Sequence, residues 1–250
     1  MSKPLSPIVL VPARMASSRL PGKPLADIAG APMIVHVWRR ATEAGIGPVV
    51  VACAEPEIVA AVEAAGGHAV LTRPDHPSGS DRIFEALSIL DPKQHHDVVV
   101  NLQGDLPTLD PAVVRTALEP LSDPACDIAT LVAPIQDPGE RDDPNVVKVA
   151  LSMPACAACG RALYFSRSTI PWGEGPLFHH IGLYAYRRPA LARFVSLPPG
   201  ILEQRERLEQ LRALENGMRI DAAVVGTVPL GVDTEADLAR ARALLAVAAR

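Results

Sequence analysis

The stretch IVLVPARMASSRLPGKP, at residues 8–24, is the most informative part of this sequence. Its first four residues form an apolar run that is typical of a buried strand. The loop that follows carries Arg14, Arg19 and Lys23, and no acidic residue occurs before Asp27. In open α/β sheets, ligands bind at the carboxyl ends of the strands. The cations therefore predict a site for a polyanion, most simply a triphosphate, after the first strand.

Simple electrostatics and local motifs support this interpretation of the loop. At an effective dielectric constant of about 20, each close cation–phosphate pair contributes on the order of 4 kcal/mol before desolvation. Pro21 and Pro24 stiffen the loop, which argues against a merely solvated basic segment. Lys23 is followed by proline, so the G-x-x-x-x-G-K-[ST] phosphate loop is absent. The G-x-G-x-x-G fingerprint is also missing, which argues against an NAD-linked oxidoreductase.

Composition places the chain among ordinary globular proteins. It has 250 residues, 48% of them hydrophobic and 21% charged, which suits one domain with an inserted lobe. No apolar run reaches the roughly 18 residues that a membrane-spanning helix needs, and the N-terminus leads into the first strand without a signal-peptide pattern. We therefore expect a cytoplasmic protein with no membrane partner. The net charge of −4 argues against nucleic-acid binding, which needs a basic face.

The first half of the chain alternates apolar strands with helical patterns. We expect strands at 8–11, 49–52, 69–71 and 97–102, and helices at 32–45, 56–65, 80–90 and from 110 onward. Ser80 is the expected N-cap of the third helix. Continuous apolar strands with helical crossovers predict an α/β fold with a mostly parallel central sheet and helices on both faces.

The second half has longer strand patterns with fewer helices between them. Strands are expected at 128–134, 146–151, 162–165, 181–187 and 220–225, and helices at 201–217 and 234–245. This pattern predicts a smaller mixed or antiparallel excursion. We expect a core at about 8–125 and 219–250, with a lobe at about 126–218. Leu208, Leu211 and Leu214 form a stripe on the 201–217 segment, which suits either the core or a subunit contact.

Two aspartates are candidate metal ligands. Asp105 follows the strand at 97–102, and Asp233 precedes the last helix. Each of them, taken alone, could simply cap a turn or a helix. Together, beside a basic phosphate loop, they would supply the hard oxygen ligands that Mg²⁺ prefers. The cysteines give a weaker signal: Cys53 and Cys126 are expected to be buried, and Cys156 and Cys159 are too few for a zinc site.

Four motifs recur in the order found in a known family. They lie at residues 12–25, 101–105, 162–172 and 231–234, and the similarity extends from about residue 8 to residue 245. The sequence closely resembles the 3-deoxy-manno-octulosonate cytidylyltransferase (CMP-KDO synthetase) family. The resemblance implies a Rossmann-like nucleotidyltransferase fold and transfer of CMP from CTP to KDO, releasing pyrophosphate for lipopolysaccharide biosynthesis. It also implies Mg²⁺ as cofactor and a homodimer, with the 126–218 lobe serving sugar binding and dimerisation.

The resemblance assigns expected roles to matching positions. Catalysis would rest on Arg14, Lys23, Asp105 and Asp233, with the two aspartates as the Mg²⁺ ligands. CTP would contact Arg14, Arg19, Lys23, Arg73, Ser80 and Gln103. KDO would contact Arg167, His180, Tyr184, Glu209 and Gln210, of which Arg167 suits the sugar carboxylate. From the residues alone, His180 and Tyr184 could equally be structural, and Glu209 and Gln210 could be solvated.

The chain departs from the family pattern in three places, of which the Ala155–Cys159 segment, where the family has a simple turn, is interpreted as local variation. Leu106 stands where the family usually has glutamate, so any contact of that carboxylate is absent. The segment between Trp172 and His180 is shorter than usual, at the expected sugar pocket. Two alternatives follow: a cytidylyltransferase for another acid sugar, such as sialic acid or an amino-KDO analogue, or a non-catalytic nucleotide-binding homologue. Retention of Asp105 and Asp233 argues against the second.

Overall fold

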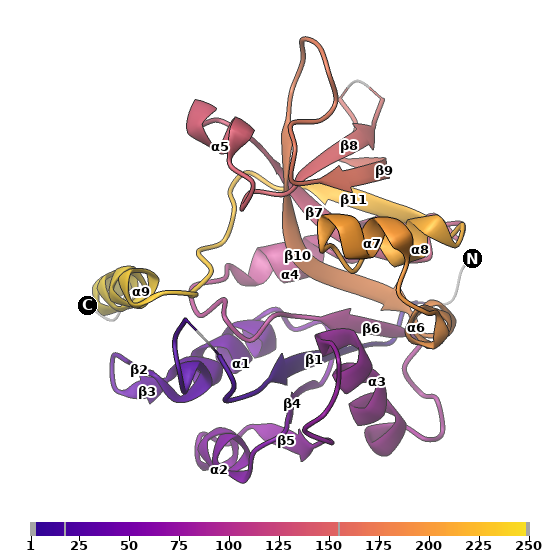
Figure 1. Cartoon of the computed structure of the whole chain (residues 1–250). Coiled ribbons are helices and arrows are strands. Elements are labelled where there is room, and N and C mark those ends of the chain that lie inside the picture. Colours follow the sequence, from indigo (N-terminus) through magenta and orange to yellow (C-terminus); the bar gives the residue numbers. More distant parts are fainter. Residues whose placement is uncertain (1–3, 18, 155, 249–250) are drawn as a thin grey trace. The chain divides into compact units, whose positions relative to one another are not determined.

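The computed structural model describes residues 4–17, 19–154 and 156–248 (Figure 1). Ser18 of the basic loop and Ala155 of the Ala155–Cys159 segment lie outside the described residues. Contacts within the chain define two units. Unit 1 runs to Val114 and resumes at Pro229, and unit 2 covers Arg115–Val228. Among the described residues, no helix combines the length and apolarity needed to cross a bilayer.

Unit 1 contains a parallel sheet in the order β5-β4-β1-β6. Its strands are β1 (Pro7–Ala13), β4 (Val49–Cys53), β5 (His68–Leu71) and β6 (Val98–Asn101). Every residue of β4 and β6 is buried, as are most of β1. Because parallel strands covered by helices have no solvent-facing side, they need continuous apolar sequence rather than alternation. The sequence pattern of this half is confirmed.

The helices of unit 1 connect these strands. They are α1 (Met33–Glu43), α2 (Pro56–Ala64), α3 (Gly79–Leu90) and α9 (Glu235–Ala248), with α4 (Pro111–Thr116) at the boundary. A short 3-10 turn, η1 (Lys23–Leu25), and the β2 (Asp27–Ile28) and β3 (Ala31–Pro32) ribbon follow the basic loop. Helices α1 and α2 pack on β4, and α3 packs on β1. Gly45, in the left-handed region at φ 66°, follows α1 closely, as the sequence predicted.

Unit 2 is mainly antiparallel. Its strands are β7 (Ile128–Pro134), β8 (Lys148–Ser152), β9 (Cys159–Ser166), β10 (Phe178–Arg187) and β11 (Ile220–Val224). They run in the order β10-β7-β11-β9-β8, and β8 pairs again with β10 through Lys148 and His179, so the sheet curls toward a barrel. Among the strand pairs described for this unit, only β11 and β7 run parallel. The predicted mixed excursion is therefore present.

Short helices complete unit 2: η2 (Glu119–Ser122), α5 (Pro138–Asp142), α6 (Arg188–Ser196), α7 (Ile201–Glu206) and α8 (Leu211–Glu215). The single helix predicted for 201–217 is wrong, because Arg207 takes the left-handed conformation at φ 57° and ends α7. Leu208 and Leu211 are buried within the fold, so this stripe serves the core.

Two further boundaries differ from the sequence prediction. Ser78, not Ser80, caps α3, since the Ser78 hydroxyl accepts a hydrogen bond from the Asp81 amide at 3.2 Å. The units divide at 114/115 and 228/229 rather than near 125/126 and 218/219. The cause is that η2 and β11 pack with β7 and β9 of unit 2.

Candidate functional site

The basic loop of unit 1 is held in a defined shape. Gly22 adopts the left-handed conformation at φ 71°, which suits glycine. Its amide donates to the Met15 carbonyl at 3.4 Å, and the Met15 amide donates to Glu55 Oε1 at 3.0 Å. Leu20 anchors the loop in a small apolar cluster with Met33 and Val232. These contacts anchor the loop at Met15 and at Leu20–Gly22, between and beside the positions that carry its cations.

Lys23 joins the two candidate aspartates. Its ammonium donates to Asp105 Oδ2 at 2.9 Å and to Asp233 Oδ1 at 3.1 Å. These positions lie far apart in the sequence, yet their carboxylates converge on one nitrogen. Burial lowers the pKa of Lys23, but the two carboxylates outweigh it, so the pKa lies above the ordinary 10.5. Arg19 adds a second contact to Asp233, at 3.0 Å from Oδ2.

Backbone packing explains why Asp105 reaches the loop. A Cβ on Gly104 would lie 2.8 Å from the Pro12 carbonyl oxygen, so only glycine lets the two backbones approach this closely. The Val232 amide donates to the Asp105 carbonyl at 2.9 Å, which ties the segment before α9 to the segment after β6. These contacts place Asp105 and Asp233 side by side.

The structure also excludes the simpler interpretation of Asp233, in which its side chain caps the last helix. The cap of α9 is supplied by its neighbour, because the Asp237 amide donates to the Thr234 hydroxyl at 3.3 Å. The Asp237 carboxylate accepts in return from the Thr234 amide at 3.0 Å. The Asp233 side chain is therefore not the helix cap, and it contacts Lys23 and Arg19 instead.

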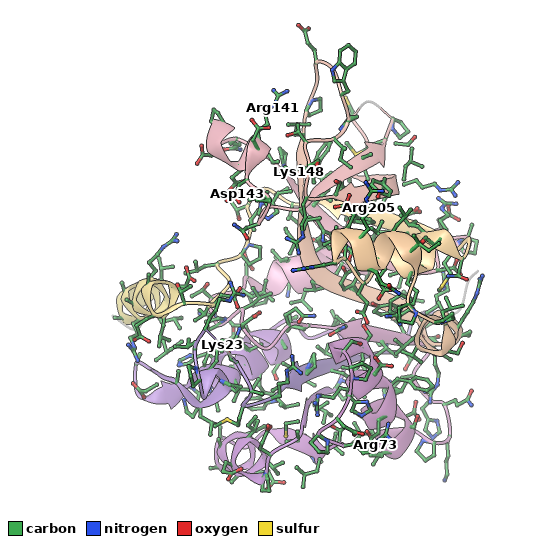
Figure 2. All side chains as sticks on the ribbon, in the orientation of Figure 1. Lys23, Arg73, Arg141, Asp143, Lys148 and Arg205 are labelled. Atoms are coloured by element: carbon green, nitrogen blue, oxygen red, sulfur yellow. The ribbon has the colours of Figure 1, made fainter. Side chains whose placement is uncertain are left out.

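A cavity of about 370 Å³ lies over this loop in unit 1. Of the predicted residues, Arg14, Arg19, Lys23, Gln103 and Asp105 line it. Arg73 and Ser80 are not in its lining: Arg73 is 68% exposed beside Glu85, and Ser80 is buried in the first turn of α3. In Figure 2, Arg73 lies well apart from Lys23 within unit 1. Contacts of Arg73 and Ser80 with a nucleotide stay predictions.

Four polar residues that line the cavity were not predicted from the sequence: Ser17, His76, Ser78 and Arg82. Arg82 is 3% exposed and donates through Nη1 to Thr72 Oγ1 at 2.7 Å and to the Arg73 carbonyl at 3.2 Å. Burial, together with Arg14, lowers its pKa, against the opposing effect of Glu55. The sequence could have indicated these residues. The loop between β5 and α3 follows a parallel strand, so it lies at the same edge of the sheet as Arg14.

His76 is held by a carboxylate behind the cavity wall. Its Nε2 contacts Glu85 Oε2, and the same carboxylate accepts from the Arg73 amide at 3.2 Å. Burial raises the pKa of Glu85, but the hydrogen bonds from His76 and Arg73 lower it by more, so the net shift is downward. This pairing fixes the turn that leads into α3.

The predicted sugar-contacting residues belong to unit 2. His180 stacks edge-on against Phe165, with ring centroids 4.9 Å apart, and lies 5.5 Å from the Tyr184 ring. Its Nε2 lies 3.0 Å from Thr130 Oγ1. Burial, reinforced by His179, lowers the pKa of His180 to about 3, so the ring is neutral. Burial also raises the pKa of half-buried Tyr184, with smaller contributions from Tyr186 and Glu209.

Arg167 is held by backbone oxygens. Its Nε donates to the Glu206 carbonyl at 2.9 Å, and its Nη1 donates to the Pro144 carbonyl at 2.8 Å. Glu209 lies 3.9 Å from Arg212, and Gln210 is buried at the start of α8. His180 and Tyr184 are neighbours, and Glu209 is close enough to Tyr184 to help raise its pKa, whereas Arg167 belongs to a network around Glu206.

The cysteines carry no metal signal in the described part of the chain. Cys53 and Cys126 are buried thiols, as predicted, and burial raises the pKa of each, to about 11 and about 12. Cys156 and Cys159 are also free thiols. Within the described residues, no cluster of three or more histidine, cysteine or acidic side chains is poised to hold a metal ion.

Comparisons with known proteins point to one family. The family model described as cytidylyltransferase matches residues 8–220. The 3-deoxy-manno-octulosonate cytidylyltransferase of Methylobacterium radiotolerans is 69% identical over 239 residues, covering 96% of each chain. That of Methylorubrum populi is 68% identical over 241 residues, covering 96% of this chain and 97% of its own.

A solved structure adds the three-dimensional comparison. It is CMP:2-keto-3-deoxy-manno-octonic acid synthetase in complex with CTP. It is 43% identical to this chain, with a TM-score of 0.89 over 97% of this chain and 99% of its own. The similarity therefore extends over both units, including the strands that carry the cavity of unit 1.

Proposed function

This chain belongs to the cytidylyltransferase family, and from that premise we propose that it transfers CMP from CTP to 3-deoxy-D-manno-octulosonate (KDO). The products are CMP-KDO and pyrophosphate, and CMP-KDO feeds lipopolysaccharide biosynthesis. Relatives that are 68–69% identical over nearly the whole chain carry this activity in their names. The full-length similarity favours KDO over other acid sugars and over a non-catalytic role.

One observation of the structure carries the proposal. Asp105 and Asp233 converge on Lys23 at 2.9 and 3.1 Å, next to a cavity lined by Arg14 and Arg19. A nucleoside triphosphate is a polyanion that needs cations along its phosphates and carboxylates to hold a divalent ion. Residues of both kinds lie together in unit 1, which supports the proposal.

The chain's own residues account for the binding of CTP in this proposal. Arg14, Arg19 and Lys23 hold the phosphates and stabilise the negative charge that grows on the departing pyrophosphate. Gln103 lines the same cavity, which supports its proposed contact with the nucleoside. The anomeric hydroxyl of the sugar attacks the α-phosphorus as the bond to pyrophosphate breaks. Such a reaction depends on positioning and electrostatics and needs no covalent nucleophile.

The residues present fit Mg²⁺. Asp105 and Asp233 both contact the Lys23 ammonium, at 2.9 and 3.1 Å, and carboxylate oxygens are the ligand type that Mg²⁺ takes with water and phosphate. Asp105 and Asp233 would hold the ion. When bound, it would neutralise charge on the phosphates. Leu106 is 8% exposed and apolar, so it adds no ligand.

On the sugar side we propose Arg167 for the carboxylate and His180, Tyr184, Glu209 and Gln210 for the remainder of KDO. Support comes from the neighbouring positions of His180, Tyr184 and Glu209. Guanidinium–carboxylate pairing supports Arg167. A cytoplasmic location is proposed because CTP is a cytoplasmic metabolite. A homodimer is also proposed, and light scattering on the purified protein tests it.

The experiment is a pyrophosphate-release assay. CTP, UTP and ATP are each paired with KDO, with sialic acid and with an amino-KDO analogue, in the presence of Mg²⁺. We expect turnover with CTP and KDO above every other pair, and loss of turnover when EDTA removes the metal. Preference for another sugar would refute the substrate, and tight CTP binding without turnover of any sugar would refute the enzyme.

A further inference from the structure

A buried lysine in unit 2 has no role in the function described above. Lys148, on β8, is fully buried, although a charged side chain is costly to remove from water without partners. Its ammonium donates to three backbone carbonyls: Asp143 at 2.7 Å, Val146 at 2.9 Å and Arg167 at 2.9 Å. In Figure 2 the side chain lies beside Asp143. All three donors of the ammonium are thus used.

Lys148 is linked to Arg167 in two ways, through the Arg167 backbone and through the turn that binds its guanidinium. Lys148 holds the Arg167 carbonyl and the turn at 143–146. That same turn supplies the Pro144 carbonyl that accepts from Arg167 Nη1 at 2.8 Å. Lys148 therefore fixes both the backbone of Arg167 and one acceptor of its guanidinium.

Glu206, at the end of α7, holds the other side of Arg167. Its carboxylate accepts from the Arg167 amide at 3.1 Å and from Ser166 Oγ at 2.8 Å. Its carbonyl accepts from Arg167 Nε at 2.9 Å. The left-handed Arg207 ends α7 directly after this residue, so the Glu206 carbonyl points away from the helix ladder and remains available.

The arrangement directs the remaining donors of Arg167. A guanidinium has five N–H donors in one plane. The contacts above use Nε and Nη1, and within the described residues no protein acceptor of Nη2 is seen. The residue is half-buried, and among the described residues Nη2 is neither bonded to a protein acceptor nor fully buried, so it remains open to solvent. A guanidinium held in this way is suited to bind a carboxylate.

We propose that Lys148 and Glu206 are positioning residues that orient Arg167 toward the carboxylate of the acid sugar. The inference rests on the proposed function, because it takes Arg167 as the partner of that carboxylate. Neither residue touches substrate in this account. Each acts by fixing the orientation of the Arg167 guanidinium. Their loss therefore weakens binding of the sugar and leaves binding of the nucleotide unchanged.

The test compares Lys148→Met with wild type in the pyrophosphate assay. We expect the KM for KDO to rise about tenfold or more, which corresponds to about 1.4 kcal/mol, with the KM for CTP within about twofold. Lys93→Met makes the same chemical change at an exposed site in unit 1 and should alter neither constant. Glu206→Gln keeps the side-chain shape but removes the charge, and it should raise the KM for KDO in the same direction.

A double-mutant cycle separates positioning from a merely structural role. If Lys148 acts through Arg167, Lys148→Met in an Arg167→Ala background adds little to the KM for KDO, whereas independent effects multiply. Multiplying effects, or an unchanged KM for KDO in Lys148→Met, would overturn the proposal. So would loss of the folded state by circular dichroism in both Lys148→Met and Glu206→Gln. A wild-type protein without turnover on CTP and KDO would instead refute the proposed function.

Discussion

Replacing Lys23 with methionine removes the charge on which the two aspartates converge and keeps most of the side-chain volume. At about 3 Å and an effective dielectric constant of about 20, each pair contributes on the order of 5 kcal/mol before desolvation. Asp233 is 47% exposed and keeps its contact with Arg19, so solvent screens much of this energy. Charged hydrogen bonds contribute about 1.5–3 kcal/mol net, and we expect a loss of about 1–3 kcal/mol in the free energy of unfolding.

The assays follow from these magnitudes. For a chain of this length, 1 kcal/mol shifts Tm by about 2–4 °C, so Lys23→Met should melt about 2–12 °C lower. Loss of one donor to a developing anionic charge costs about 10²–10³ in kcat, and we expect a fall of at least about 100-fold in the pyrophosphate assay. CTP binding by calorimetry should weaken as well. Lys93→Met is the matched control. Turnover within about threefold of wild type, with unchanged CTP affinity, would refute the role of Lys23.

The remaining predictions address the same site and one buried histidine. Asp105→Asn and Asp233→Asn should each reduce kcat by at least about 100-fold in Mg²⁺, with far-UV circular dichroism unchanged; substantial residual turnover would contradict the metal assignment. Gly104→Ala should cost about 1–3 kcal/mol in urea unfolding, since its Cβ would lie 2.8 Å from the Pro12 oxygen; an unchanged midpoint would contradict the close approach. His180 has a folded pKa of about 3 against an ordinary 6.5, so its neutral form favours folding above pH 6.5 and this stability is lost as the pH falls toward 3. His180→Gln should therefore unfold less steeply with acid over that range, and an identical acid profile would argue against a buried neutral ring.

The parallel half of the fold was predictable because one physical rule governs it. Strands covered on both faces cannot alternate, so β4 and β6 are visible as unbroken apolar runs. The break in the helix predicted for 201–217 could not be inferred from the sequence, because it depends on the left-handed backbone at Arg207, which ends α7 before α8. Arginine rarely adopts this conformation, and no glycine or proline marks the break.

The candidate site also contains residues that could be predicted from the sequence and residues that could not. Arg14, Lys23 and Asp105 follow strands of a parallel sheet, so their common edge could be inferred from strand order alone. Arg82 was missed because it lies inside a helix whose periodicity reads as ordinary amphipathic sequence. Its burial becomes apparent only when Thr72 and the Arg73 carbonyl are seen to accept its hydrogen bonds.

Asp233 shows what the structure adds to an assignment made from the sequence. An aspartate before a helix is by default a cap, and the sequence alone gives that interpretation equal standing. Thr234 and Asp237 satisfy the first turn of α9 between them. The Asp233 carboxylate is therefore surplus to the helix, and it lies against Lys23 and Arg19 at about half exposure. Its observed partners are two cations beside the cavity of unit 1, and under the proposed function the same carboxylate is available to a divalent ion. Asp233 is therefore the more informative position at which to test the proposed Mg²⁺, because its side chain does not cap α9.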